Sequence, residues 1–317
     1  MLSLSLTVLP IFALLLFGVL LQRKRFPVEG FWPGVDKLVY WVMFPAMLFY
    51  QTSRVDLSSP VLPSYASVLA FALISVSLFV LAVCYLMKVP RPTGTSVLQA
   101  GVRFNTFIAL AVAGALYGDE GLALATLGAA ILIPTINVFL VVSMVSLHGQ
   151  QDSSKPAKSL PSLLVKELFK NPLILAIMAG IGVNFMGIEK VFLVTDMTGI
   201  LARATLPLVL LAVGASLRMQ AFKGAGSLLI YSSLARLFVF PLCIGIACTF
   251  LALDPLVSCV AVLFGAVPTA TSAYALAKQL GGNAPIMSVF INVQTGLSVI
   301  TLPLTMWLAQ IWFGFSL

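Results

Sequence analysis

Charged side chains are scarce in this chain: Asp, Glu, Lys and Arg together make up 9% of its 317 residues. A soluble domain carries about 25% charged residues. Apolar residues instead account for 60% of the chain, and the mean hydropathy is +1.09. This balance excludes a soluble fold, and with it the nucleic-acid partner that a net charge of +8 would suggest in a soluble protein. The composition predicts an all-α polytopic membrane protein.

Residues for metal binding and nucleophilic catalysis are also few. The four cysteines lie in apolar stretches without CxxC or histidine-containing spacing, and the single histidine, His148, falls in a polar segment. The chain has neither the HExxH nor the GxSxG signature of membrane-embedded hydrolases. We therefore expect no disulfide, no metal site, no bound cofactor and no enzyme activity.

Long apolar runs are what the chain does contain, and a membrane-spanning helix needs about 20 apolar residues. Ten spans can be placed, at 4–22, 34–53, 62–87, 95–117, 121–147, 167–187, 191–217, 226–251, 256–279 and 283–311. The polar segment 148–166 is predicted to be a cytoplasmic linker. It separates a first repeat of five spans (1–147) from a second (167–317).

The basic residues predict the orientation of these spans. Two of the 18 basic residues, Arg54 and Lys190, fall in one set of alternate loops. The opposite loops hold Arg23, Lys24, Arg25, Lys37, Lys88, Arg91, Lys155, Lys158, Lys166, Lys170, Arg218, Lys223 and Lys278. Because basic loops stay in the cytoplasm, both termini are expected on the outer side of the cell (inner) membrane. The remaining basic residues, Arg103, Arg203 and Arg236, lie at membrane depth.

The two halves share a register of interruptions. Pro45 and Pro207 lie 162 positions apart, and Asn105 and Pro268 lie 163 apart. With five spans in each half, related halves must be inverted with respect to one another. Such inverted repeats are typical of secondary transporters, whose substrate sites lie at discontinuous helices near the midplane.

The predicted fourth and ninth spans carry these interruptions in their centres. The fourth has a polar cluster around Arg103 to Thr106, and the ninth has Pro268 followed by Thr269, Thr271 and Ser272. The N–H groups of an opened helix end carry partial positive charge and suit a carboxylate. A proline kink patched by neighbouring helices is the alternative for each span, but matched interruptions in both halves favour an anion site.

Several runs resemble the auxin efflux carrier family, which includes bacterial malonate-type carriers. The resemblance covers nearly the whole chain. It is carried by KNPL at 170–173, LARATLPLVLLAVGASL at 201–217, VPTATSAYALAKQLGG at 267–282 and SVITLP at 298–303.

The resemblance implies a fold shared with bile-acid sodium symporters. In that fold, helices four and nine unwind and cross, and helices 1, 2, 6 and 7 form a scaffold. The transport core of helices 3–5 and 8–10 slides against this scaffold. Matched motif positions then imply substrate binding at Asn105 and Pro268, with Thr106, Thr269, Thr271 and Ser272 adjacent.

The charged and amide residues within spans are further candidates. Arg103 can attract or bind an anionic substrate, or cap loose carbonyls at the crossing. Asp196 can take part in proton coupling or be a solvated residue at a helix start, and a water-linked pair with Arg203 is a further possibility. The family fold places Asn292 and Gln294 near the crossing, where they can contact substrate or ion or join helices by hydrogen bonds.

The predicted function is transport of a small organic anion, malonate-like or auxin-like, by elevator-type alternating access. A non-transporting membrane receptor for such an anion and a sodium-coupled symporter are the alternatives. Because the predicted ninth span has no Asp or Glu, sodium coupling lacks a charged ligand there, and proton coupling or facilitated transport stays open. The expected partners are the anion and the lipid bilayer, with a homodimer as an open possibility.

Overall fold

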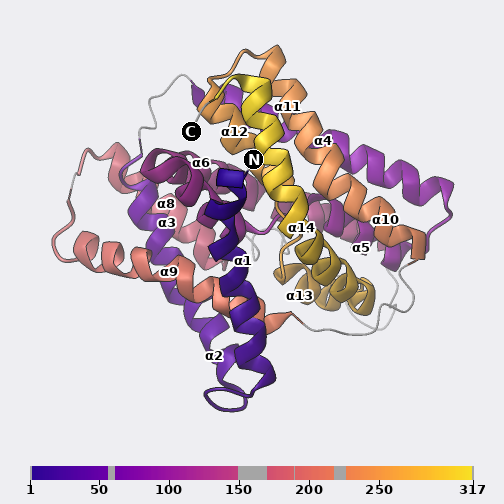
Figure 1. The fold of residues 1–317 in the computed structure, drawn as a ribbon, viewed down its shortest axis with the longest axis horizontal. Coiled ribbons are helices and arrows are strands. Elements are labelled where there is room, and N and C mark those ends of the chain that lie inside the picture. The colour runs from indigo at the N-terminus through magenta and orange to yellow at the C-terminus, as the bar shows by residue number, and fades with distance from the viewer. Residues whose placement is uncertain (1, 56–60, 149–169, 189, 218–225, 316–317) are drawn as a thin grey trace.

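Helices dominate the architecture of this protein (Figure 1). The computed structural model describes residues 2–55, 61–148, 170–188, 190–217 and 226–315. The helices of the first half are α1 (Leu2–Arg23), α2 (Phe31–Leu38), η1 (Val39–Met43), α3 (Phe44–Thr52), α4 (Val61–Leu86), α5 (Arg91–Val102) and α6 (Thr106–His148). Those of the second are α8 (Pro172–Phe185), α9 (Val194–Ser216), α10 (Gly226–Leu234), η2 (Ala235–Val239), α11 (Phe240–Phe250), α12 (Pro255–Ala266), α13 (Ser272–Gln279) and α14 (Ala284–Phe313). The prediction of an all-α protein is confirmed for the described residues.

The helices have the length and apolar character of membrane spans. In the described part of the chain, six apolar helical segments have at least 18 residues: Leu4–Arg23, Val61–Leu86, Thr106–Leu147, Val194–Ser216, Gly226–Phe250 and Ala284–Phe313. Large apolar side chains such as Leu16, Ile74 and Ile300 are exposed on their outer faces. Lipid tails can cover such surfaces, so this is a multi-pass membrane protein. The division into ten spans and two inverted halves stays a prediction.

Helix α6 contains the sharp turn predicted between the fourth and fifth spans. Gly118 has φ 62° and ψ −153° inside an otherwise helical run of 43 residues. This conformation is easily reached only by glycine. The turn divides α6 into a first segment, which follows the helix break at Arg103, and a longer second segment.

Two helices contain a single π-helical turn just before a proline. The turn Val39–Met43 precedes Pro45, and the turn Ala235–Val239 precedes Pro241. Proline donates no N–H and crowds the preceding turn, so a widened turn relieves the mismatch. Arg236 lies in the second of these turns, and its side chain is fully buried.

The helices pack in two groups, which meet through α6 and through a direct contact between α1 and α14. One group consists of α1, α2, η1, α3, α8 and α9, and the other of α4, α5 and α10 to α14. Figure 1 shows the first group around α9 and α2, and the second around α4, α5 and α14. Gly18 of α1 faces the carbonyl of Leu211, and Gly214 of α9 faces the carbonyl of Leu15, with no room for a Cβ atom at either glycine. The backbones of α1 and α9 are therefore in direct contact.

Some predictions lie outside the described residues. They are most of the linker 148–166, the start of the predicted sixth span, and the basic residues Lys155, Lys158, Lys166, Arg218 and Lys223. His148, placed in the linker by the sequence pattern, is the last residue of α6.

Candidate functional site

Two extended segments separate neighbouring helices, one between α5 and α6 and the other between α12 and α13. Helix α5 ends at Val102, Arg103 has extended backbone angles (φ −80°, ψ 115°), and α6 begins at Thr106. Helix α12 ends at Ala266, Val267 is likewise extended (φ −74°, ψ 151°), and α13 begins at Ser272.

The two extended segments pair with each other by backbone hydrogen bonds. The Asn105 N–H donates to the Pro268 carbonyl at 2.8 Å, and the Ala270 N–H donates to the Arg103 carbonyl at 3.3 Å. Phe104 and Thr269 form an isolated antiparallel bridge. Lipid offers no hydrogen-bond partner, so each interruption supplies the backbone groups that the other needs.

A buried polar network supports this pairing from α14. The Thr269 hydroxyl lies 2.6 Å from Gln294 Oε1 and 2.5 Å from the Ala100 carbonyl. The Thr269 N–H donates to the same Gln294 oxygen at 3.2 Å, and Gln294 Nε2 donates to the Ala100 carbonyl at 3.3 Å. Thr269 and Gln294 are both fully buried. Gln294 thus joins α14 to the ends of both interrupted helices.

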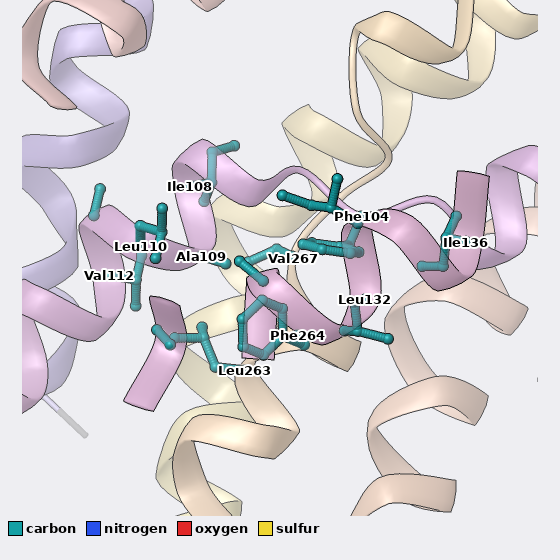
Figure 2. Close-up of a cluster of buried hydrophobic side chains, with 14 of the residues drawn as sticks. Phe104, Ile108, Ala109, Leu110, Val112, Leu132, Ile136, Leu263, Phe264 and Val267 are labelled. Carbon is teal, nitrogen blue, oxygen red and sulfur yellow. The ribbon is translucent and has the colours of Figure 1, made fainter. Parts of the chain in front are cut away.

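Apolar side chains pack around the same crossing (Figure 2). The rings of Phe104 and Phe264 meet edge to face, with centroids 5.1 Å apart. Figure 2 shows them with Val267 among buried side chains of α6 and α12, including Ile108 and Leu263. This packing and the network through Gln294 hold the extended segments in one arrangement.

The two short segments also position their polar side chains. Asn105 Oδ1 accepts hydrogen bonds from the Phe107 and Ile108 N–H groups at 3.1 and 3.2 Å, so Asn105 caps the start of α6. Arg103 Nε donates to Ser272 Oγ at 3.2 Å, which links the first interruption to the start of α13.

A cavity of about 410 Å³ opens beside the crossing. One wall comes from the first helix group. It consists of Tyr40 in η1, Phe44 in α3, Leu173 in α8 and Asn171, which caps α8. The remaining wall consists of residues 103–107, of Ile133, Ile136 and Asn137 in α6, and of Ala270, Thr271, Ser272, Ala275, Leu276 and Gln279. The starts of α6 and α13 both border this space, and first-turn N–H groups of helices attract anions. The cavity combines an apolar body with a cation and several hydrogen-bonding groups, as small-ligand sites do.

The structure brings five of the predicted substrate residues together in this cavity: Arg103, Asn105, Thr106, Thr271 and Ser272. Pro268 and Thr269 are buried in the crossing behind it, where their backbones pair with the first interruption. Among the predicted coupling residues, Gln294 belongs to the crossing network, and Asn292 is half-buried in α14.

Asp196 lies apart from the crossing. Its carboxylate forms an ion pair with Lys190 at 2.9 Å, and both side chains are 59% exposed. Asp196 is in the first turn of α9, where the helix dipole favours an acid.

The sequence pattern missed four polar residues of the cavity: Tyr40, Asn137, Asn171 and Gln279. Asn171 precedes Pro172 and caps α8 through its contact with the Leu173 N–H at 3.0 Å. The Asn-Pro pair at a helix start is a visible signal for a capping residue. No sequence signal places the other three residues beside the crossing.

Comparison of the sequence with known proteins identifies relatives among membrane transport proteins. A family model described as a membrane transport protein matches residues 3–306. A "Putative malonate transporter" of Rhizobium meliloti (strain 1021) is 27% identical over 193 residues. That match covers 58% of this chain and 60% of the relative, which is less than two thirds of its length. The resemblance to auxin efflux carriers is confirmed: the family model covers nearly the whole chain, and this protein belongs to that family of membrane transport proteins.

Proposed function

We propose that this protein moves a small organic anion across the cell membrane by elevator-type alternating access. The observation that carries the proposal is the position of the cavity. It lies between the two helix groups and is bordered by Arg103 and by the starts of α6 and α13. A carboxylate there would meet a guanidinium and the positive ends of two helices. The substrate class is a malonate-like dicarboxylate or an auxin-like monocarboxylate. The name of the Rhizobium relative supports the first.

The proposed architecture is ten spans in two inverted repeats. Two observations support a relation between the two halves at a spacing of about 163 positions. First, α5 and α12 end 164 positions apart, at Val102 and Ala266. Second, Gly118 and Gly281, which are 163 positions apart, both have positive φ. In this arrangement the helix group of α1, α2, η1, α3, α8 and α9 is the scaffold, and the other group moves with the substrate. A rigid moving group is favoured because Phe104, Asn105 and Thr269 are buried and Gln294 of α14 bonds to Thr269 and Ala100.

The proposed orientation places both termini on the outer side, because basic residues such as Lys24, Lys88 and Lys278 fall in the opposite loops. A membrane-impermeant reagent is expected to label a single cysteine added at either end of an otherwise cysteine-free chain in intact cells. Labelling at both ends only after the membrane is opened would reverse the proposed orientation.

Substrate recognition is tested by uptake of labelled malonate into proteoliposomes. We expect saturable uptake that other small carboxylates inhibit and that neutral malonamide does not. Replacing Arg103 with Gln is expected to raise KM by roughly 10-fold or more, because a hydrogen bond to a charged group contributes about 1.5–3 kcal/mol. R103K keeps the charge and should fall between R103Q and the wild type.

The matched control is R203Q, which removes an exposed arginine of α9 and should leave KM unchanged. Equal KM values for R103Q and the wild type would remove Arg103 from the site. If a folded protein binds malonate without any uptake, the protein is instead a non-transporting receptor for the anion.

A further inference from the structure

Arg236 is a fully buried arginine on the side of the crossing formed by the helix ends. Its guanidinium donates hydrogen bonds to the Val267 carbonyl at 2.7 Å, to the Val102 carbonyl at 3.4 Å and to the Phe264 carbonyl. Val102 is the last residue of α5, whereas Phe264 and Val267 belong to the last turn and C-cap of α12. One side chain therefore caps the carboxyl ends of both interrupted helices.

These carboxyl ends create a strongly negative place in the protein. Each helix end has carbonyls without helical partners and carries about half a negative charge. Here two such ends converge among fully buried residues, Val102, Phe264 and Val267. In transporters with interrupted helices, such carbonyls are the groups that coordinate Na⁺.

The Arg236 charge is balanced by these carbonyls, and neither of the two ion pairs in the described part of the chain includes it. The Phe240 ring adds a further contact, with its centroid 4.7 Å from the guanidinium carbon. Burying a cation costs several kcal/mol unless hydrogen bonds compensate it. Three carbonyls and an aromatic face provide that compensation, so the residue is suited to stay charged in place.

Arg236 is also separate from the substrate cavity. The cavity is bordered by Arg103 and the starts of α6 and α13, and Arg236 is absent from its lining. The two arginines thus lie in different surroundings at the same crossing: Arg103 borders the cavity, and Arg236 contacts the carbonyls of two helix ends. Arg103 follows α5, and its side chain reaches Ser272 at the start of α13, whereas the Arg236 guanidinium contacts carbonyls at the ends of α5 and α12.

We infer that Arg236 is a resident cation that holds α5 and α12 together and takes the place of a bound coupling cation. Anion transport by this protein then needs no Na⁺ at the crossing. Only this consequence for transport rests on the proposed function; the role of Arg236 at the helix ends does not depend on it.

The test compares the purified wild type with R236K, R236Q and the control R203Q. Melting temperatures are measured in NaCl, LiCl and N-methylglucamine chloride at equal ionic strength. For the wild type, for R236K and for R203Q, the melting temperature of each protein should be the same in all three salts. R236Q should melt at a lower temperature than the wild type. In R236Q, the Gln oxygen and the three carbonyl oxygens that Arg236 contacted can bind Na⁺ or Li⁺. Because a bound ligand stabilises the folded state, either cation should raise the melting temperature of R236Q by about 3 °C.

Uptake of labelled malonate is measured in the same salts. Replacing Na⁺ with N-methylglucamine should change wild-type uptake by less than about two-fold, whereas R236Q should lose roughly 10-fold in the absence of Na⁺ and Li⁺ and recover partly in their presence. R236K should keep most of the activity. Rescue by Lys and by a small cation separates a role of charge from a role of side-chain volume.

Three results would overturn the inference: wild-type stability or uptake that requires Na⁺, R236Q that matches the wild type in every salt, or R236Q that is destabilised yet indifferent to cations. If R236Q does not fold, the wild type and R236K decide, because both must be indifferent to Na⁺. Melting needs no substrate. If the melting pattern is found but no carboxylate is taken up, the proposed function fails and the role of Arg236 stands.

Discussion

Replacing Asn105 with Asp is expected to abolish most malonate uptake while keeping the cap at the start of α6. Asp caps a helix start as well as Asn does, so the contacts to the Phe107 and Ile108 N–H groups are kept. The new carboxylate, however, borders the cavity beside the expected anion. Two unit charges about 5.5 Å apart repel by roughly 3 kcal/mol at an effective dielectric constant of about 20. This corresponds to a loss of about 100-fold in kcat/KM.

The measurement is malonate uptake together with the melting temperature of each variant. N105S keeps a capping oxygen without the charge and should retain most activity. N105A loses the cap, so it should lose stability, by about 1 kcal/mol, as well as uptake. Wild-type kcat/KM in N105D would show that the substrate anion does not approach Asn105, and the proposed site would be wrong.

Replacing Gln294 with Leu is expected to destabilise the protein by breaking the buried network that joins α14 to the crossing. Gln294 accepts from the Thr269 N–H and donates to the Ala100 carbonyl. Leu would leave the buried Thr269 N–H without this partner, at about 1–3 kcal/mol, whereas the Ala100 carbonyl keeps its contact with the Thr269 hydroxyl at 2.5 Å. At about 2 °C per kcal/mol, the melting temperature should fall by roughly 2–6 °C.

The control for this change is T301V on the same helix. The Thr301 hydroxyl is buried, and it has no hydrogen-bond partner in the described part of the chain. Removing it should change the melting temperature by less than about 1 °C, since no hydrogen bond is lost. If the melting temperature of Q294L falls no more than that of T301V, the hydrogen bonds of Gln294 do not stabilise the crossing. A stable Q294L with reduced uptake would instead assign Gln294 to the transport step.

Much of this architecture could be predicted from residue types alone. Apolar runs marked the helices, because a span must satisfy its own backbone and face lipid with apolar side chains. The boundary between the predicted spans 95–117 and 121–147 coincides with the turn inside α6, where Gly118 has positive φ. Pro268 and the polar cluster from Arg103 to Thr106 marked the interruptions, because such residues are unfavourable in the middle of a span.

Other features could not be predicted, because the groups involved have no residue-specific signature. The acceptors of Arg236 are backbone carbonyls, which every residue has, and they lie 28 to 134 positions away in the chain. In the sequence, Asp196 could be a proton-coupling acid or a solvated residue at a helix start; in the structure it is exposed and paired with Lys190. The sequence pattern left both alternatives open for Asp196, and its distance from the membrane surface depends on where α9 begins.

The sequence by itself determined that this is a helical membrane protein and to which transport family it belongs. Only the tertiary structure decided which groups meet at the interruptions. Tyr40 and Asn171 reach the cavity from helices far away in the chain, and Arg236 reaches two helix ends at once. The physical reason is that composition and periodicity report how each segment meets lipid, whereas polar groups inside a membrane protein must find partners wherever packing brings them.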